Sequence, residues 1–276
     1  MAKITAHTLV KNEERFLWFS VMSVIDCVDE VLLWDMGSED GTREVIKVIG
    51  ESSEKIKTRF LDGVGVEEFA DVRQEMLSAT KTDWFLVVDG DEIWWQDSIR
   101  RVVRTIREEG EGLESIVVPT VNLVGDMYHY QEERAGLYRL AGRRGHLSLR
   151  AVNRKIPGLH SRNPHGTWGW ADEDGKQIQD RDQKKIKFLD APYLHATFLE
   201  RSSLDRSVPK RAKKRRHELG IAFPGDYFYP EVFFRPRPDF VEVPWTPMNM
   251  GFKFRAFFET PLRKAKRRLL PSKVGY

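Results

Sequence analysis

The sequence is poor in cysteine and has no long hydrophobic run, and each absence excludes a class of protein. Cys27 is the only cysteine among 276 residues, so no disulfide can form within the chain. This favours a reducing compartment, and we expect a cytoplasmic location. No stretch approaches the roughly 20 apolar residues that cross a bilayer. The chain enters a strand pattern at once, so we expect no signal peptide.

The composition is that of a globular protein, with 41% hydrophobic and 32% charged residues. A length of 276 residues allows one large core, or a core with an appendage. The net charge is only +3, but it is unevenly distributed. Residues 89–97 are acidic, whereas residues 206–217 and 263–273 are strongly basic. This asymmetry says more about binding partners than the total charge does.

The first third of the chain alternates between strand and helix patterns. It predicts four strands with a helix after each of the first three, the strands at 3–10, 30–34, 57–61 and 84–88. This order is typical of a parallel sheet with helices on both faces. In such a sheet, ligands bind beyond the carboxyl ends of the strands. Four polar residues fall at such ends: Asn12, Asp35, Asp62 and Asp89. Asn12 is also a good N-cap for the first helix.

An acidic cluster follows the most apolar of these strands. Trp84 to Val88 reads as a strand buried on both faces, and Asp89, Asp91 and Glu92 follow at once. Three carboxylates in such a place repel one another and are costly to desolvate. A hard divalent cation such as Mg²⁺ or Mn²⁺ is the simplest remedy, and it could clamp a diphosphate. The alternative is a solvated acidic turn.

Two common nucleotide-binding motifs are missing. Gly63-Val64-Gly65 follows a predicted strand, but Glu68 stands where the third glycine of a dinucleotide fingerprint would be. No phosphate loop that ends in Gly-Lys-Ser or Gly-Lys-Thr occurs in the sequence. The sequence therefore does not indicate nucleotide binding through either of these two motifs.

The second half of the chain has a less regular pattern. It predicts a helix at 98–107, a strand at 115–124 that its proline could break, and a loop or lid over 125–146. Further strands are expected at 147–152 and 188–198, and the latter carries His195. Arg201 to Leu219 predicts a very basic helix. Pro261 and Pro271 are expected to limit any helix in the tail to under three turns.

Several ordered motifs resemble glycosyltransferase family 2. They are Val10 to Glu14, Val28 to Val31, Asp35 to Thr42, Asp71 to Arg73 and Trp84 to Glu92. The likeness is closest over residues 3–92, while His195-Ala196-Thr197 and Arg201-Ser202 look like the closing segment of related members. The resemblance implies a GT-A-type, Rossmann-like α/β fold with a doubly wound mixed sheet. It also implies a nucleotide-diphospho-sugar donor and inversion at the anomeric centre.

The resemblance implies roles for most of the polar residues at the strand ends. Asp35 would hydrogen-bond the nucleobase, expected to be uracil, and Arg73 would approach the nucleotide or its phosphates. The rest of the donor site would comprise Leu9, Val10, Asn12, Asp89 and Gly90. Mn²⁺ or Mg²⁺ would be held by Asp89, Asp91 and His195. The alternatives are a surface arginine at position 73 and a core histidine at position 195.

The catalytic base is not identified by the resemblance. Inverting transfer needs a group that takes the proton from the acceptor hydroxyl. Related members often place a His-Glu pair where this sequence has Pro164-His165-Gly166. His165 and Asp172 are therefore the candidates, followed by Glu173. The alternative for Asp172 is an acidic hairpin turn, and the nearby Trp168 and Trp170 could stack on a sugar or belong to the core.

We expect a glycosyltransferase domain at 1–200 and a helical or irregular extension at 201–276. Within the domain, residues 1–92 would bind the nucleotide-sugar and residues 93–200 the acceptor. The expected reaction is metal-assisted transfer from a UDP-sugar to a glycan or lipid-linked hydroxyl. One alternative is a nucleotidyltransferase or pyrophosphorylase, although these usually have a glycine-rich basic loop after the first strand. Another is a nucleic-acid-binding protein, but the acidic rim would repel nucleic acid, so we expect none to bind.

The basic segments predict peripheral contact with the anionic inner face of a membrane. Six Lys or Arg residues lie between Pro209 and His217, and the tail from Phe252 to Leu270 mixes phenylalanines and leucines with cations. Apolar anchors beside a cationic cluster suit an interfacial segment. The alternatives are a solvated helix face for the first segment and a tail packed on the catalytic domain for the second.

Overall fold

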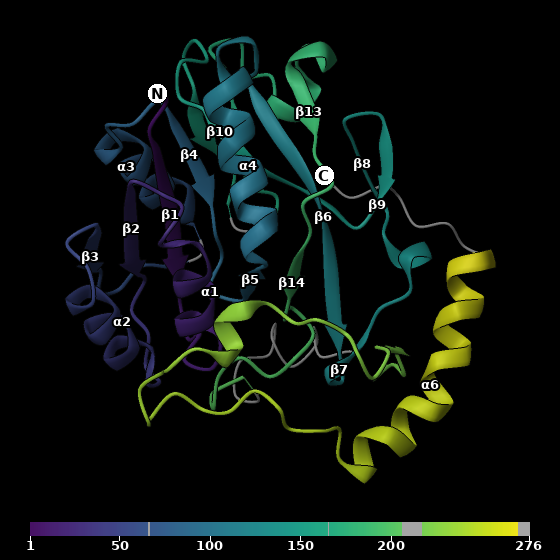
Figure 1. Cartoon of the computed structure of the whole chain (residues 1–276). Helices are drawn as coiled ribbons and strands as arrows, with labels where there is room; N and C mark the ends of the chain where they lie inside the picture. Colours follow the sequence, from purple (N-terminus) through teal and green to yellow (C-terminus); the bar gives the residue numbers. More distant parts are fainter. Residues whose placement is uncertain (66, 165, 206–216, 270–276) are drawn as a thin grey trace.

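The first half of the chain forms the parallel part of one twisted sheet. In the computed structural model (Figure 1), residues 1–65, 67–164, 166–205 and 217–269 are described. Four parallel strands lie side by side in the order β3-β2-β1-β4. Their bounds are β1 (Ile4–Val10), β2 (Glu30–Asp35), β3 (Ile56–Phe60) and β4 (Trp84–Val87). All residues of β1 and β4 are buried, which explains the wholly apolar sequence of β4, whereas β1 also buries Thr5, His7 and Thr8.

The second half extends this sheet in mixed directions. Strand β10 (Leu147–Asn153) pairs antiparallel with both β4 and β6 (Ser115–Val124). Strand β14 (Tyr193–His195) joins β6 to β5 (Glu92–Trp94), which places His195 beside Glu92. The sheet is completed by β7 (Asp126–Tyr130), β13 (Ile186–Phe188) and β15 (Ile221–Ala222).

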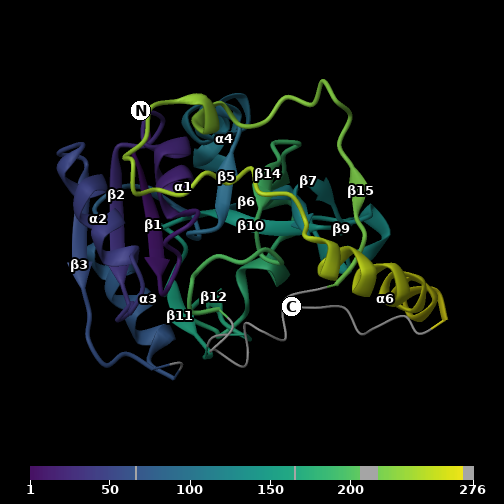
Figure 2. The ribbon, with the colours of Figure 1, turned by 90° about the horizontal axis from the view of Figure 1, so that it is seen from below.

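Helices cover both faces of this sheet. Figure 2 shows α1 (Leu17–Val24) and α4 (Gln96–Glu109) on one side, and α3 (Phe69–Ala79) with the ribbon of β11 (His160–Arg162) and β12 (Gly169–Ala171) on the other. Helix α2 (Thr42–Glu51) packs on α1 and β3. This is the doubly wound mixed α/β sheet expected from the sequence, so the fold prediction is confirmed.

Short elements connect these layers. One two-stranded ribbon consists of β8 (Tyr138–Leu140) and β9 (Arg143–Gly145). Single turns of 3-10 helix lie at η1 (Gly110–Gly112), η2 (Glu133–Ala135), η3 (Ile178–Asp180), η4 (Gln183–Lys185) and η5 (Glu231–Phe234). The turn η5 brings Phe233 against Phe19 of α1, with ring centroids 4.9 Å apart. Part of the segment after residue 217 therefore belongs to the main core.

The structure corrects three expectations for the second half. The expected loop at 125–146 contains β7, β8 and β9 instead, because its short alternating segments pair with one another and with β6. The expected strand at 188–198 is two short strands, β13 and β14, separated by residues that include Pro192. Strand β6 is not broken at Pro119, because the next residue, Thr120, donates its backbone N–H to the carbonyl of His146 at 2.9 Å.

The expectation for the tail helix is also wrong. Helix α6 (Met250–Leu269) has 20 residues and continues through Pro261. The proline removes one hydrogen bond, to the carbonyl of Phe257, but Phe257 is exposed and water can satisfy that carbonyl. The expected basic helix at 201–219 falls largely on residues 206–216, which lie outside the described part of the chain. Among the residues described, no helix is both long and apolar enough to cross a bilayer.

Candidate functional site

Two loops that follow neighbouring parallel strands hold each other at the carboxyl edge of the sheet. The side-chain oxygen of Asn12 accepts a hydrogen bond from the backbone N–H of Glu39 at 2.8 Å. The carboxylate of Glu14 accepts one from the backbone N–H of Gly41 at 2.7 Å. The two polar motifs are therefore halves of one structure, which we call the loop clamp: residues 12–14 and 38–42.

Asn12 does not cap the first helix, contrary to the expectation from the sequence. Helix α1 begins only at Leu17, and its N-cap position is Phe16. Asn12 instead has a φ of +56°, a left-handed conformation that asparagine adopts more readily than most residues. That conformation places its side chain in the loop clamp.

A third segment joins the loop clamp from far along the chain. The hydroxyl of Ser202 donates to Oδ2 of Asp40 at 2.5 Å, and the backbone N–H of Ser203 donates to Oε1 of Glu14 at 2.6 Å. These partners are 162 and 189 positions apart in the sequence. The segment that begins at Arg201 is thus held against the loop clamp at the carboxyl edge of the sheet.

Asp35 is fully buried at the end of β2, where its carboxylate holds the following turn. Both carboxylate oxygens accept a hydrogen bond from the backbone N–H of Ser38 at 3.1 Å. Nε of Arg43 lies 2.8 Å from Oδ2. These contacts give Asp35 a structural role, and its contact with a nucleobase stays a prediction.

The turn after β4 packs closely on β1, which explains its glycine. A Cβ on Gly90 would lie 2.9 Å from Cγ1 of Val10 and 3.0 Å from Cβ of Glu13, so a larger residue would force the two segments apart. Both Leu9 and Val10 are buried at the end of β1. This strand end supports the turn, and its contact with a nucleobase is untested.

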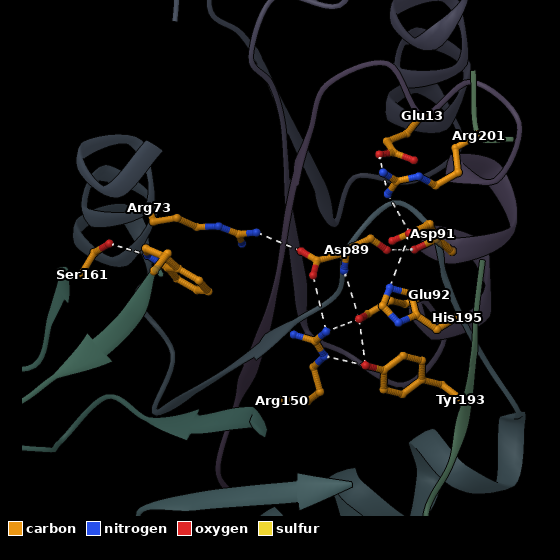
Figure 3. A network of polar contacts seen from close by, with 12 residues as sticks. Glu13, Arg73, Asp89, Asp91, Glu92, Arg150, Ser161, Tyr193, His195 and Arg201 are labelled. Carbon is orange, nitrogen blue, oxygen red and sulfur yellow. Dashed lines mark hydrogen bonds and ion pairs between the residues drawn. The ribbon is translucent and has the colours of Figure 1, made fainter. Parts of the chain in front are cut away.

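Asp89 faces two arginines across the site (Figure 3). Nη2 of Arg73 donates to Oδ1 at 3.0 Å, and Nη2 of Arg150 lies 3.4 Å from Oδ2. Burial opposes the ionisation of Asp89, but Arg150 and Arg73 outweigh it and lower the pKa of the carboxyl. Asp89 is therefore an anion at neutral pH, balanced by two cations.

Glu92 lies beside Asp89 and is completely buried. Its Oε1 pairs with Arg150 and accepts a hydrogen bond from the hydroxyl of Tyr193 at 2.8 Å. Burial raises the pKa of Glu92 to about 7, although Arg150 opposes the rise. Arg150 also donates from Nε to the Tyr193 hydroxyl at 3.0 Å. The three side chains form a closed network that positions Arg150 against Asp89.

Asp91 is buried between a histidine and an arginine. Nε2 of His195 lies 3.4 Å from Oδ2, and Nη1 of Arg201 lies 2.7 Å from the same oxygen. The same Arg201 nitrogen lies 3.0 Å from Oε1 of Glu13. Burial opposes ionisation, but Arg201 and His195 outweigh it and hold the pKa of Asp91 well below its usual range. Burial lowers the pKa of His195, and Asp91 more than reverses this.

Asp91 and His195 fit a divalent cation as a pair of ligands. Adjacent ligands of an octahedral ion with bonds of about 2.1 Å lie about 3 Å apart, close to the separation of these two atoms. Among the described residues, no group of three His, Cys, Asp or Glu side chains is placed to hold a metal ion. Asp89 is turned toward Arg73 and Arg150, so its predicted part in the metal site is untested. Diphosphate oxygens and water would complete the shell.

Arg73 is buried under aromatic rings at the edge of this site. Its guanidinium carbon lies 5.3 Å from the ring centroid of Phe69 and 5.0 Å from that of Trp168. Its Nε and Nη1 have no hydrogen-bond partner among the described residues. Leaving buried donors unsatisfied is costly, so these two nitrogens are suited to acceptor atoms of a ligand.

The structure describes only one of the two predicted catalytic bases, Asp172. His165 lies outside the described residues. Asp172 is buried after β12, where its Oδ1 accepts hydrogen bonds from the backbone N–H groups of Asp174 and Lys176 and its Oδ2 pairs with Arg181. Burial opposes ionisation of Asp172, but the Lys176 N–H and Arg181 outweigh it and lower the pKa. This is the acidic turn weighed as an alternative, and a catalytic role for Asp172 stays a prediction.

Arg150 and Tyr193 lie outside every sequence motif, and Glu13, Glu92 and Arg201 lie within motifs that gave them no individual role. Arg150 and Tyr193 reach Glu92 from strands 58 and 101 positions later in the chain. One signal was available, because a cluster of three carboxylates requires more positive charge than one divalent ion supplies. The arginine within the otherwise uncharged strand β10 is the sequence feature that could have indicated it.

Comparisons with known proteins agree with the resemblance. Two curated relatives are a TPR repeat-containing protein of Synechococcus elongatus, 30% identical over 92 residues, and an uncharacterized glycosyltransferase of Rickettsia typhi, 34% identical over 92 residues. Each match covers 33% of this chain. It covers only 21% and 29% of those proteins, so the chain spans less than a third of the curated relatives it matches.

Solved structures with a similar arrangement share little sequence with this chain. Glucosyl-3-phosphoglycerate synthase from Mycobacterium tuberculosis, in complex with Mn²⁺, uridine-diphosphate and glucosyl-3-phosphoglycerate, is 18% identical with a TM-score of 0.48. The similarity covers 71% of this chain and 72% of that one. TarS of S. aureus is 13% identical with a TM-score of 0.47, covering 71% and 60% of the two chains.

The family itself is identified by sequence. Residues 5–165, more than half of the 276 residues, match the family described as Glycosyl transferase family 2. The match includes the loop clamp, Arg73 and the acidic turn with Asp89 and Asp91. The chain therefore belongs to glycosyltransferase family 2.

Proposed function

We propose that this protein transfers a sugar, with inversion, from a nucleotide-diphospho-sugar to a hydroxyl of a glycan or lipid-linked acceptor. UDP-sugars are the expected donors. The observation that carries the proposal is the approach of Asp91 and His195 to within 3.4 Å, at the edge where the parallel strands end. A pair of ligands for one hard cation suits a diphosphate.

The donor would lie along the carboxyl edge of the sheet. Asp91 and His195 would hold Mn²⁺ or Mg²⁺, which when bound neutralises charge on the departing diphosphate. Arg73 would donate from its two unsatisfied nitrogens to the nucleotide. Arg201 would release Asp91 and keep its ion pair with Glu13. The remaining donor contacts would come from Leu9, Val10, Asn12, Asp35, Asp89 and Gly90.

The acceptor hydroxyl would attack the anomeric carbon as the nucleoside diphosphate leaves. A base removes the hydroxyl proton, and His165 and Asp172 are the proposed candidates. Asp172 could act only if its ion pair with Arg181 opened, because both carboxylate oxygens are engaged in the turn. This requirement does not apply to Glu173, which is exposed in the same hairpin.

The proposed division of labour assigns the nucleotide-sugar to residues 1–92 and the acceptor to residues 93–200. Residues 201–276 would form an extension of this domain. A lipid-linked acceptor would be met at a membrane surface. Peripheral contact with the anionic cytoplasmic face of a membrane therefore belongs to the same proposal.

A donor screen that follows the released product tests this function. The full chain is supplied with UDP-sugars and other nucleotide-sugars, with Mn²⁺, Mg²⁺ or excess chelator. We expect release of nucleoside diphosphate with a metal only, and Asp91→Asn should remove most of it. Asp97→Asn, an exposed carboxylate on α4, is the matched control and should be fully active. Formation of a nucleoside triphosphate and a sugar 1-phosphate when pyrophosphate is added to the nucleotide-sugar would favour a nucleotidyltransferase or pyrophosphorylase. Full turnover in chelator would contradict the metal site.

A further inference from the structure

Helix α6 exposes a continuous apolar face. Six large side chains on it are between 58% and 77% exposed: Met250, Phe254, Phe257, Phe258, Leu262 and Leu269. They recur at intervals of mainly three or four positions, which places them on one side of a helix. The rings of Phe254, Phe257 and Phe258 pack on one another, with centroids 5.1 Å and 5.3 Å apart. Surface helices usually turn such a stripe toward a core.

The opposite face of α6 is anchored to the body of the protein. Phe252, Ala256 and Thr260 are buried, and the Thr260 hydroxyl accepts the backbone N–H of Leu219 at 2.7 Å. Nη1 and Nη2 of Arg267 each lie 2.6 Å from a carboxylate oxygen of Glu218. These contacts fix the rotation of the helix, so the apolar face points outward. Figures 1 and 2 both place α6 at the margin of the molecule.

Cations border the apolar face on both sides. Lys253 and Lys264 are about three helical turns apart and lie along one border, while Arg255 and Lys266 have the same spacing along the other. The helix contains seven Lys or Arg residues and a single carboxylate, Glu259. Within the described part of the chain, Glu259 pairs with Arg255, whereas Lys253 and Lys266 are exposed and have no carboxylate within ion-pair distance.

This combination determines which occupant the face can take. Two copies of α6 packed face to face would bring the cationic borders of both helices together, and like charges repel. An anionic surface with an apolar interior would satisfy both the borders and the stripe. A helix with an apolar face between cationic borders is typical of segments that lie in the plane of a membrane interface.

We infer that α6 docks the protein on an anionic bilayer, with its axis in the plane of the surface. Phe254, Phe257 and Phe258 enter the boundary between headgroups and acyl chains, and the bordering cations meet the phosphates. The helix continues through Pro261, so the apolar stripe spans all 20 residues. The inference adds a defined docking surface to the proposed function and rests on it only for the lipid-linked acceptor, since docking requires no catalysis.

Co-sedimentation of the full chain with vesicles tests the docking surface. The vesicles contain phosphatidylcholine alone, or phosphatidylcholine with phosphatidylglycerol, at low and at high salt. We expect binding to the anionic vesicles that weakens with salt. The triple variant Phe254→Ser, Phe257→Ser, Phe258→Ser should weaken that binding at least about tenfold, because burial of even one phenyl ring contributes that much.

A matched control removes three exposed phenylalanines elsewhere on the surface. The variant Phe228→Ser, Phe234→Ser, Phe240→Ser changes side chains of similar exposure that are not on α6, and it should bind vesicles as the wild type does. The inference would be overturned if both triple variants weakened vesicle binding equally. It would also be overturned if the wild type bound neither kind of vesicle, or bound both kinds equally. The inference would also be overturned if light scattering showed that the wild type is a dimer and that only the α6 triple variant is a monomer.

The docking surface and the proposed function fail separately in this design. Calorimetric binding of UDP with Mn²⁺, without vesicles, should be unchanged in both triple variants, since none of the six phenylalanines is placed in the donor site. Vesicle binding without UDP binding would leave the docking surface intact and contradict the proposed donor. UDP binding without vesicle binding would support the proposed donor and contradict the docking surface.

Discussion

At the scale of single residues, Arg73 is the clearest case of unused bonding capacity. Among the residues that the structure describes, this buried cation pairs with one carboxylate, and two of its nitrogens have no acceptor. We expect Arg73→Lys to weaken UDP binding by about 10- to 100-fold, because hydrogen bonds to charged groups contribute about 1.5–3 kcal/mol. Calorimetry with Mn²⁺ present measures the change.

A control separates this effect from a general loss of arginine. Arg59→Lys changes a half-exposed arginine that pairs with Glu75 and lies over the ring of Trp34 on β2. It should leave UDP affinity unchanged. If Arg73→Lys binds UDP as tightly as the wild type, the two nitrogens do not face the nucleotide.

The catalytic base is a prediction at the same scale. His165→Ala or Asp172→Asn should lower turnover by roughly 10²- to 10⁴-fold while leaving donor binding unchanged, because a base acts on the acceptor proton. Turnover is measured by nucleoside diphosphate release, and donor binding by calorimetry. Normal turnover in both variants would place the base elsewhere, and Glu173 would be the next residue to test.

At the scale of elements, Arg181 ties the hairpin after β12 to the start of β6. Its Nε lies 2.7 Å from Oε2 of Glu114, and it also pairs with Asp172. Arg181 lowers the pKa of Glu114 against the effect of burial. A carboxyl whose pKa is lower in the folded state stabilises the fold at pH values above its unfolded pKa. That stabilisation is lost as the pH falls through the folded pKa.

The consequence is a pH-dependent stability difference. Arg181→Met should lower the midpoint of thermal unfolding at about pH 7, and its deficit relative to the wild type should shrink as the pH falls below about 4.5. Arg139→Met, an exposed arginine on β8, is the control and should show no deficit at any pH. A deficit that stays constant from about pH 7 to about pH 3 would show that packing, not the ion pairs, is lost.

Elements with strong apolar patterns could be predicted from the sequence, and those that depend on distant partners could not. The runs that form β1, β2 and β4 predicted strands at the right places, because most of their side chains are suited to a buried strand. The predicted β3 was shifted by one residue toward the C-terminus. Strands β8 and β9 have three residues each, three of the six being arginine, so nothing local distinguished them from a loop. The predicted tail helix was too short because Pro261 was expected to end it. The sequence does not show that Phe257, whose carbonyl loses its hydrogen bond, is exposed to water.

The candidate site divides in the same way. The approach of Asp91 to His195 agrees with the metal pair that the motifs implied. Arg150 and Tyr193 contribute through the pairing of β10, β14 and β5, which no motif records. Asp35 and Asp172 were predicted as ligand or catalytic groups, yet each carboxylate is engaged in its own turn. An isolated acidic residue in a turn has the same sequence signal in either role.

At the scale of the whole molecule, the extension is not uniform. Val232, Phe233 and Val241 belong to the main core, whereas α6 packs in a separate small cluster with Met248. A chain ended after residue 249 should therefore fold. A chain ended after residue 200 should be strongly destabilised, since loss of a buried phenylalanine such as Phe233 alone costs about 3–5 kcal/mol. Circular dichroism melting curves of the two truncated chains test this difference, and equal stability would contradict it.

The fastening of Ser202 and Ser203 to the loop clamp bears on how relatives can be recombined. A hybrid could join residues 1–92 of one family member to the remainder of another. Its loop clamp would then come from one protein, and the residues that replace Ser202 and Ser203 would come from the other. The contacts of Glu14 and Asp40 would then depend on residues that never co-existed with them. Grafts should carry residues 12–14, 38–42 and 201–203 together. The part of this site that must be transferred as a unit consists of three short segments that are widely spaced in the chain. It is not one contiguous half of the sequence.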